Sequence, residues 1–239
     1  MSSSLAQRHR VPEVMDDPGL DRARHEAALA GLARLNRLAA PARAIWRGVR
    51  SRLGAHEPLR ILDLGCGSGD VSLAAATHAA EEALFVELTG CDLSDVATDI
   101  ATSTETPSRV EARFVTCDAL DLAALRTLEV RPHIVMTSLF MHHLDPRDAV
   151  TLMGNMRALA SDLVVVDDLI RDRVGYVLAA VGSRLLTRSD VVHTDALRSV
   201  RAAFSPTEVL GLAREAGLED ITLSRHWPAR FLMMARGAA

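Results

Sequence analysis

The sequence has few cysteines, no excess of positive charge and no long apolar run. Its three cysteines among 239 residues lack metal-ligand spacing, so we interpret them as reduced thiols of a cytosolic protein. The net charge of −4 argues against a broad nucleic-acid-binding surface. The longest apolar stretch, near residues 174–181, is far short of a membrane span, and the first ten residues lack a signal-peptide h-region. We therefore expect a cytoplasmic protein with neither a nucleic-acid partner nor a membrane span.

The composition that remains is that of one globular domain, with 49% hydrophobic and 24% charged residues. Residues 1–12 are interpreted as a polar, disordered tail, and 13–239 as a single domain. Within that domain we distinguish N-terminal helices (13–55), a core (60–170), an insert (171–204), and a C-terminal helix with strands (205–239).

Strand and helix patterns alternate from residue 60 onward. Strands are predicted at 60–64, 84–91, 112–116, 133–139 and 162–167, with two more at 219–225 and 230–235. Helices are predicted between the first five strands, at 70–82, 94–103, 119–128 and 146–160. This alternation gives a parallel sheet with helices on both faces. We expect an α/β fold with a Rossmann-like, seven-stranded, mostly parallel sheet.

Three further helices have signals of their own. Apolar residues at helical spacing predict helices at 20–38, with Asp21 as a candidate cap, and at 42–53. They form an N-terminal extension to the core. A third helix, at 206–216, starts with a capping box, since Ser205 stands three residues before Glu208 and a proline lies between them.

The insert at 171–204 is too long for a simple connection. Four apolar residues mark one helix with a single apolar stripe, namely Val174, Val177, Val181 and Leu185. Residues 187–204 show no clear period and include His193. Long loops in compact domains are usually lids or binding elements, so we expect the insert to be a helical lid that covers a substrate.

A glycine-rich run directly follows the first strand. Gly65, Gly67 and Gly69 stand between that strand and an alanine-rich helix that begins near Asp70. Glycine lets the backbone turn tightly and approach a ligand closely. The helix N-terminus behind the loop offers free N–H groups and a positive dipole end. The run therefore predicts a binding site for a polar or anionic small molecule.

The spacing of these glycines differs from the dinucleotide fingerprint, in which the third glycine comes one residue later. Residues 63–69, DLGCGSG, instead resemble motif I of the class I S-adenosylmethionine-dependent methyltransferases. The alternative for a short motif is a structural turn in another Rossmann-like protein, such as a dehydrogenase. The resemblance covers residues 60–170 by motif and 205–235 by pattern, and it implies S-adenosylmethionine as cofactor. Residues 12–17 and 187–204 also resemble methyltransferases found beside bacterial type III polyketide synthases.

The resemblance implies roles for residues at three strand ends. In motif I it implies cofactor contacts by Asp63, Gly65, Cys66 and Gly67. Asp92, after the second strand, would accept hydrogen bonds from the ribose hydroxyls, and Leu93 would pack on the adenine. Asp118 would accept a hydrogen bond from the adenine amine, and the Ala119 N–H would meet a ring nitrogen. Ser138 is a further candidate cofactor contact. The alternative for Asp92 and Asp118 is that each caps the following helix.

Two histidines follow the fourth strand, where the transferable methyl group should lie. His142 and His143 stand where methyltransferases of amide or nucleobase nitrogens carry Asn/Asp-Pro-Pro-Tyr/Phe, so those substrates become unfavoured. Histidine can accept a proton near neutral pH. We expect one of the pair to be the catalytic base, with a slight preference for His143, and we expect their side chains to diverge. His193 in the lid is a third candidate. The alternative is that the pair merely closes the turn.

Asp167 and Asp168 end the fifth strand, and paired carboxylates can hold a metal ion. No third ligand is identifiable, so we assign no metal and expect helix capping or solvent exposure instead.

Together these patterns predict a methyltransferase that acts on a small, partly apolar molecule, most simply on a phenolic or polyketide hydroxyl. C-methylation of a quinol or polyketide ring and a non-catalytic adenosylmethionine-binding protein are the alternatives. The sequence leaves open whether the protein forms a homodimer.

Overall fold

The computed structural model describes residues 5–17 and 19–238. Seven strands form one sheet in the order β3-β2-β1-β4-β5-β7-β6. Their bounds are β1 Leu59–Leu64, β2 Val86–Asp92, β3 Val110–Thr116, β4 Ile134–Ser138, β5 Leu163–Leu169, β6 Glu219–His226 and β7 Arg230–Arg236. Strands β1 to β5 are parallel, and β7 pairs antiparallel with both β5 and β6. The predicted α/β sheet is therefore confirmed.

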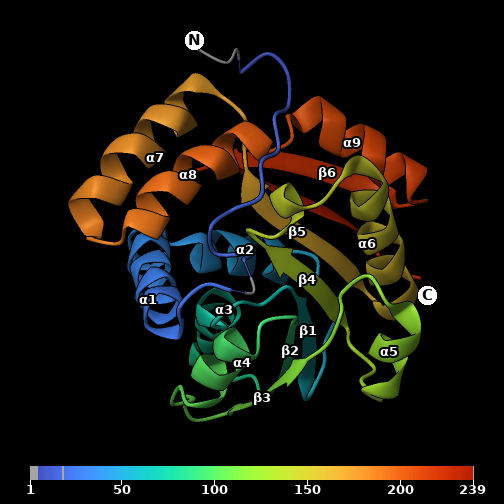
Figure 1. The fold of residues 1–239 in the computed structure, drawn as a ribbon. Helices are drawn as coiled ribbons and strands as arrows, with labels where there is room; N and C mark the ends of the chain where they lie inside the picture. Colours follow the sequence, from blue (N-terminus) through green and yellow to red (C-terminus); the bar gives the residue numbers. More distant parts are fainter. Residues whose placement is uncertain (1–4, 18, 239) are drawn as a thin grey trace.

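Helices cover both faces of this sheet (Figure 1). One face carries α2 (Pro41–Arg50), α3 (Asp70–Glu81) and α4 (Asp95–Thr102), and the other carries α5 (Leu122–Thr127), α6 (Pro146–Leu159) and α9 (Pro206–Glu215). Each face buries its own apolar cluster, with Trp46 and Val71 in the first and Met153 and Val209 in the second. The central strands read as continuous apolar runs because both of their faces are covered.

A third group of helices stands beside the carboxyl ends of the strands. It consists of α1 (Arg22–Ala39), α7 (Arg173–Leu186) and α8 (Asp190–Ala202) (Figure 1). Ala28 of α1 and Val191 and Val192 of α8 form a small buried cluster there. The sequence predicted no helix in the second half of the insert. The structure has α8 there. The sequence pattern does not indicate this helix because two of its buried positions, Asp195 and Ser199, are polar and interrupt the apolar period.

The apolar stripe of α7 faces solvent. Val174, Val177, Val181 and Leu185 are 62%, 58%, 52% and 78% exposed. The stripe is therefore not part of the buried core, and the expectation that the insert covers a substrate stays a prediction. It is α8 of the insert that packs inward, against α1 and the N-terminal segment.

The N-terminal segment, residues 5–17, runs across the strand ends toward α1 (Figure 1). The Arg8 guanidinium donates to the carbonyls of His142 and Leu144 at 2.9 and 2.7 Å. The Asp195 carboxylate accepts from the backbone N–H groups of Val14 and Met15 at 2.9 and 3.0 Å. The expected disordered tail is thus corrected for residues 5–12, whereas residues 1–4 lie outside the described part of the chain.

The helix caps follow the sequence signals. Asp21 caps α1, and Ser205 and Glu208 form the capping box at α9. Among the residues that the structure describes, no helix combines the length and apolar character needed to cross a membrane.

Candidate active site

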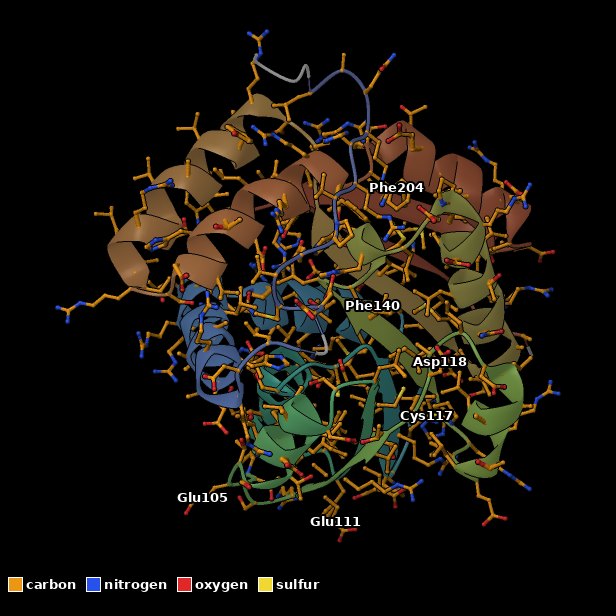
Figure 2. The ribbon with its side chains drawn as sticks, viewed as in Figure 1. Glu105, Glu111, Cys117, Asp118, Phe140 and Phe204 are labelled. Carbon is orange, nitrogen blue, oxygen red and sulfur yellow. The ribbon has the colours of Figure 1, made fainter. Side chains whose placement is uncertain are left out.

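The strand order reverses at β1, which pairs with β2 on one side and with β4 on the other. In open α/β sheets, ligands bind outside the carboxyl ends of the strands at such a point. The glycine loop leaves β1 there, and a short 3₁₀ turn, η1 (Met141–His143), follows β4. Figure 2 shows Phe140, just before η1, and Asp118, just after β3, in this part of the molecule.

The glycine loop has a backbone that other residues adopt only with strain. Gly65, Gly67 and Gly69 have φ angles of 70°, 53° and 72°. A Cβ atom on Gly65 would lie 2.3 Å from the Phe140 ring, and one on Gly69 would lie 2.7 Å from the Phe114 ring. At Gly67 no described atom lies within 4 Å of that position. The loop therefore packs tightly at both ends and leaves open space over its middle glycine.

Asp92 ties the end of β2 to this loop. Its two carboxylate oxygens accept from the Gly67 N–H at 2.8 Å and the Ser94 N–H at 2.9 Å. Ser94, and not Asp92, caps α4, because its hydroxyl accepts from the Ala97 N–H at 3.2 Å. The helix-capping alternative for Asp92 is thereby excluded. Each carboxylate oxygen retains acceptor capacity for a diol, so the ribose role stays a prediction.

Asp63 is a buried carboxyl with an unused acceptor. It is 2% exposed, and its Oδ1 atom has no hydrogen-bond partner in the described structure. Burial raises the pKa of Asp63 to about 7. A hydrogen bond from Ser72 lowers this pKa somewhat, whereas the nearby charges of Asp92 and Asp70 raise it further. A buried unpaired acceptor costs free energy, so this site gains stability from a cationic or N–H donor.

Asp118 and its neighbours form a turn after β3. The Asp118 Oδ1 atom accepts from the Leu120 N–H at 2.8 Å, whereas Asp121 caps α5. The capping alternative for Asp118 is therefore excluded as well. Ala119 is buried and Leu93 is 67% exposed. The adenine contacts of Asp118, Ala119 and Leu93 stay predictions.

Ser138 and Asp167 belong to a buried polar network at the ends of β4 and β5. The Ser138 hydroxyl donates to Asp167 at 2.8 Å and accepts from Arg230 at 3.1 Å, so it is engaged within the protein. Asp167 also pairs with Arg230 and His226. Burial favours the neutral carboxyl, but the Arg230 charge and these hydrogen bonds hold the pKa of Asp167 below its usual value. The expected capping or exposure of Asp167 is wrong.

Asp168 is also buried and binds His142 twice. One carboxylate oxygen lies 2.7 Å from the His142 Nδ1 atom, and the other accepts from the His142 backbone N–H at 2.9 Å. The expected exposure of Asp168 is therefore corrected. Because a carboxylate accepts, we assign the proton of the neutral imidazole to Nδ1, which leaves a lone pair on Nε2.

The His143 ring lies beside the His142 ring. Their centroids are 4.3 Å apart, because both residues share the η1 turn, and the expected divergence is wrong. The His143 Nδ1 atom lies 3.1 Å from Asp16. Burial favours neutral imidazole, but the Asp16 hydrogen bond and the charges of Glu13 and Asp16 raise the pKa of His143 to about 9.

Glu13 completes this group from the N-terminal segment. Its carboxylate oxygens lie 3.7 Å from His142 Nε2 and 4.0 Å from His143 Nε2, and it accepts from the Ser199 hydroxyl at 2.5 Å. Burial raises the pKa of Glu13, and the two histidines and Ser199 oppose the rise. The sequence did not single out Glu13 for chemistry, because nothing near it in the chain indicates contact with η1.

His193 does not join this group. It lies on α8, and its Nε2 atom contacts the Thr187 carbonyl at 2.9 Å. A ring nitrogen beside a carbonyl oxygen must donate, so this atom carries a proton and is not poised to accept one.

Comparisons with known proteins agree with this geometry. Residues 61–162 match the family model described as a methyltransferase domain. The chain is 27% identical over 181 residues to a ubiquinone biosynthesis O-methyltransferase of Bordetella avium (strain 197N), covering 75% of this chain and 69% of that protein.

Two solved structures share the fold. An O-methyltransferase family protein from Burkholderia thailandensis has a TM-score of 0.63 at 21% identity, over 91% of this chain and 60% of that one. Human N-acetylserotonin methyltransferase, solved with S-adenosylmethionine, has a TM-score of 0.61 at 15% identity, over 91% and 57%. This chain spans about three fifths of the length of these solved chains.

The sheet order and the glycine loop define a Rossmann-like methyltransferase fold. With the match over residues 61–162, these features identify a class I S-adenosylmethionine-dependent methyltransferase domain in this chain. The residues present fit that cofactor. Gly67 leaves open space, and the unused acceptor of Asp63 suits the amino group of its methionine moiety.

Proposed function

We propose that this enzyme methylates a hydroxyl group of a small, partly apolar molecule, most simply a phenolic or polyketide hydroxyl. One observation carries the proposal: a buried His142–Asp168 pair stands beside the cofactor loop. Phe140 links the loop to this pair through His143. Its ring packs on Gly65 and stacks against the His143 ring with centroids 6.4 Å apart, and the His143 ring lies 4.3 Å from the His142 ring. A proton acceptor at this place serves a nucleophile that must lose a proton.

S-adenosylmethionine, when bound, supplies a methyl group already activated by its sulfonium. A phenol, with a pKa of about 10, is mostly protonated at neutral pH, so its oxygen needs a base. In the proposal the Nε2 atom of His142 accepts the hydroxyl proton, and the electron pair of the O–H bond stays on the oxygen. Asp168 holds the imidazole in place and stabilises its charged form. The only other task of the protein is to align the substrate oxygen with the methyl group of the cofactor.

The cover over the strand ends supports this alignment. The N-terminal segment, α8 and α1 pack together there through a small buried cluster and the Asp195 hydrogen bonds. Holding two reactants in line in a water-poor site removes much of the entropic barrier to their reaction. The name of the curated relative, a ubiquinone biosynthesis O-methyltransferase, favours a hydroxyl group on a ring as the acceptor.

The test is activity profiling with isotopically labelled cofactor against phenols, quinols and pyrones, with each product mapped by mass spectrometry and NMR. We expect the label on oxygen. Label on a ring carbon would contradict the hydroxyl assignment. Tight S-adenosylhomocysteine binding without turnover on any of these compounds would contradict the proposed substrate class altogether.

A further inference from the structure

We propose that Glu13, His142 and His143 form a binding site for a divalent transition-metal ion of the zinc type. Each residue offers one possible ligand atom, and these three atoms all lie within 4.8 Å of one another. The carboxylate-to-imidazole separations of 3.7 and 4.0 Å are too long for hydrogen bonds. Zinc at about 2.0–2.1 Å from each ligand would place such atoms roughly 3.3 Å apart. The ligand atoms must therefore move inward from separations of up to 4.8 Å to complete the site.

The hydrogen bonds that orient Glu13, His142 and His143 are of the kind that metal ligands make in proteins. The Nδ1 atom of His142 lies 2.7 Å from Asp168, and the Nδ1 atom of His143 lies 3.1 Å from Asp16. Both contacts orient the two Nε2 atoms toward the Glu13 carboxylate, where a metal ion would take the place of any Nε2 proton. Ser199 donates to Glu13 at 2.5 Å and orients the third ligand. A carboxylate behind each ligating imidazole, and a hydrogen bond to each ligating carboxylate, are regular features of protein metal sites.

The carboxylates around Glu13, His142 and His143 also favour a bound cation. Three carboxylates, those of Glu13, Asp16 and Asp168, surround two imidazoles, and Glu13 and Asp168 are largely buried. The nearby arginines bond elsewhere. Arg8 donates to backbone carbonyls, and Arg10 donates to Asp145 and to the His143 carbonyl. The three carboxylates outnumber the one imidazole whose pKa is raised, and a dication between the ligands, in place of that imidazole's proton, offsets the remaining negative charge.

Two imidazoles and one carboxylate select the kind of ion. Magnesium and calcium prefer ligand sets made of oxygen, whereas zinc and related ions accept imidazole. Three protein ligands leave a fourth tetrahedral position open, as in catalytic zinc sites. This arrangement is separate from Asp167, whose carboxylate is already paired with Arg230 and His226.

The open position suggests a task, and this step rests on the proposed function. A hydroxyl that binds zinc ionises more readily than a free one. The substrate hydroxyl would take the fourth position, its proton would pass to solvent, and its electron pair would remain on the oxygen. In the loaded enzyme His142 would then act as a ligand, whereas in the metal-free enzyme its Nε2 atom would accept the proton.

The experiment uses the full chain, stripped with a chelator and titrated with Co²⁺ and Zn²⁺. We expect one saturable Co²⁺ site with the strong visible absorption of four-coordinate cobalt, which Zn²⁺ displaces and Mg²⁺ does not. Glu13→Gln and His143→Ala should weaken binding at least about 100-fold, and Asp168→Asn about 10–100-fold. His78→Ala is the matched control, because it removes an imidazole paired with Glu81 on α3 and should leave binding unchanged.

A wild-type chain without a saturable Co²⁺ signal would overturn the inference, and so would equal affinity in wild type and Glu13→Gln. The wild-type spectrum needs no variant to fold, and circular dichroism checks the fold of each variant. Methyl transfer is measured separately on stripped and loaded protein. Turnover without metal binding contradicts the metal site alone. Metal binding without turnover on hydroxyl substrates contradicts the proposed function alone.

Discussion

His142 and Asp168 are joined by two hydrogen bonds, one through the imidazole Nδ1 atom and one through the backbone N–H. The pair connects the turn after β4 with β5, and the parallel register places Ser138 opposite Asp167 at the same level. Neither residue can move without disturbing the other. This double contact gives the imidazole one orientation, and the predictions on catalysis depend on it.

Replacing His142 by Ala should lower turnover by about 10²–10⁴ while cofactor affinity stays nearly unchanged, because a general base is lost. The loss should shrink for phenols of lower pKa, which ionise without help. Steady-state rates across a series of substituted phenols measure this. His193→Ala is the control, and its effect should be less than about tenfold. An equally small effect of His142→Ala would show that alignment alone drives the reaction.

S-adenosylhomocysteine should raise the melting temperature, since it binds the folded state. Gly67→Val should abolish the shift by placing a side chain in the open space over the loop. Gly217→Val is the matched control. Gly217 also has a left-handed backbone, and a Cβ added there would meet no described atom within 4 Å, but it lies just after the end of α9. Equal ligand-induced shifts in both variants would contradict the placement of the cofactor.

Asp92→Ala should weaken cofactor binding by roughly 1–3 kcal/mol, the usual cost of losing a polar partner in a buried site. It also removes the acceptor for the Gly67 N–H, so the loop should become less ordered. Isothermal titration with S-adenosylhomocysteine measures the affinity. Asp121→Ala, which removes the α5 cap, serves as a control for a lost backbone contact elsewhere. Unchanged affinity in Asp92→Ala would remove Asp92 from the binding site.

The pKa of Asp63 gives the cofactor-free protein a pH-dependent stability. The folded value of about 7 lies above the unfolded value of about 3.9, so the folded state holds this proton more tightly. The resulting stability is complete below pH ~4 and is lost as the pH rises to ~7, by an amount on the order of 1–4 kcal/mol. Urea unfolding from pH 4 to 8 should show this slope, and Asp63→Asn should flatten it. A slope that persists unchanged in Asp63→Asn would contradict this assignment.

The two helices of the insert should respond differently to the same substitution. Val177→Asp on α7 should change stability and substrate use little, because the side chain is 58% exposed. Val192→Asp on α8 buries a charge and should unfold the cover or the whole protein. Thermal unfolding and steady-state kinetics compare them. Impaired substrate binding in Val177→Asp, with stability intact, would show that α7 turns its apolar stripe inward when substrate binds.

The sequence alone was sufficient for the sheet, the glycine loop and most helix boundaries. Those features depend on local signals. Apolar runs, glycines between strand and helix, and capping residues act within a few positions of one another. Motif I and the acidic residues at the end of β2 and just after β3 could therefore be placed at one edge of the sheet, because the ends of parallel strands meet there.

Only the tertiary structure decided which polar groups meet. Glu13 reaches η1 from the far end of the chain, Asp168 turns inward to His142, and the α7 stripe faces solvent. Each outcome depends on which surface a distant segment buries, and no local pattern encodes that choice. Asp195 and Ser199 interrupt the apolar period of α8, and the same two residues bind the N-terminal segment. Asp195 accepts from two backbone N–H groups of that segment, and Ser199 donates to Glu13. These polar side chains can be buried because each one is hydrogen-bonded. Their partners are far away in the sequence, so only the folded chain brings them together.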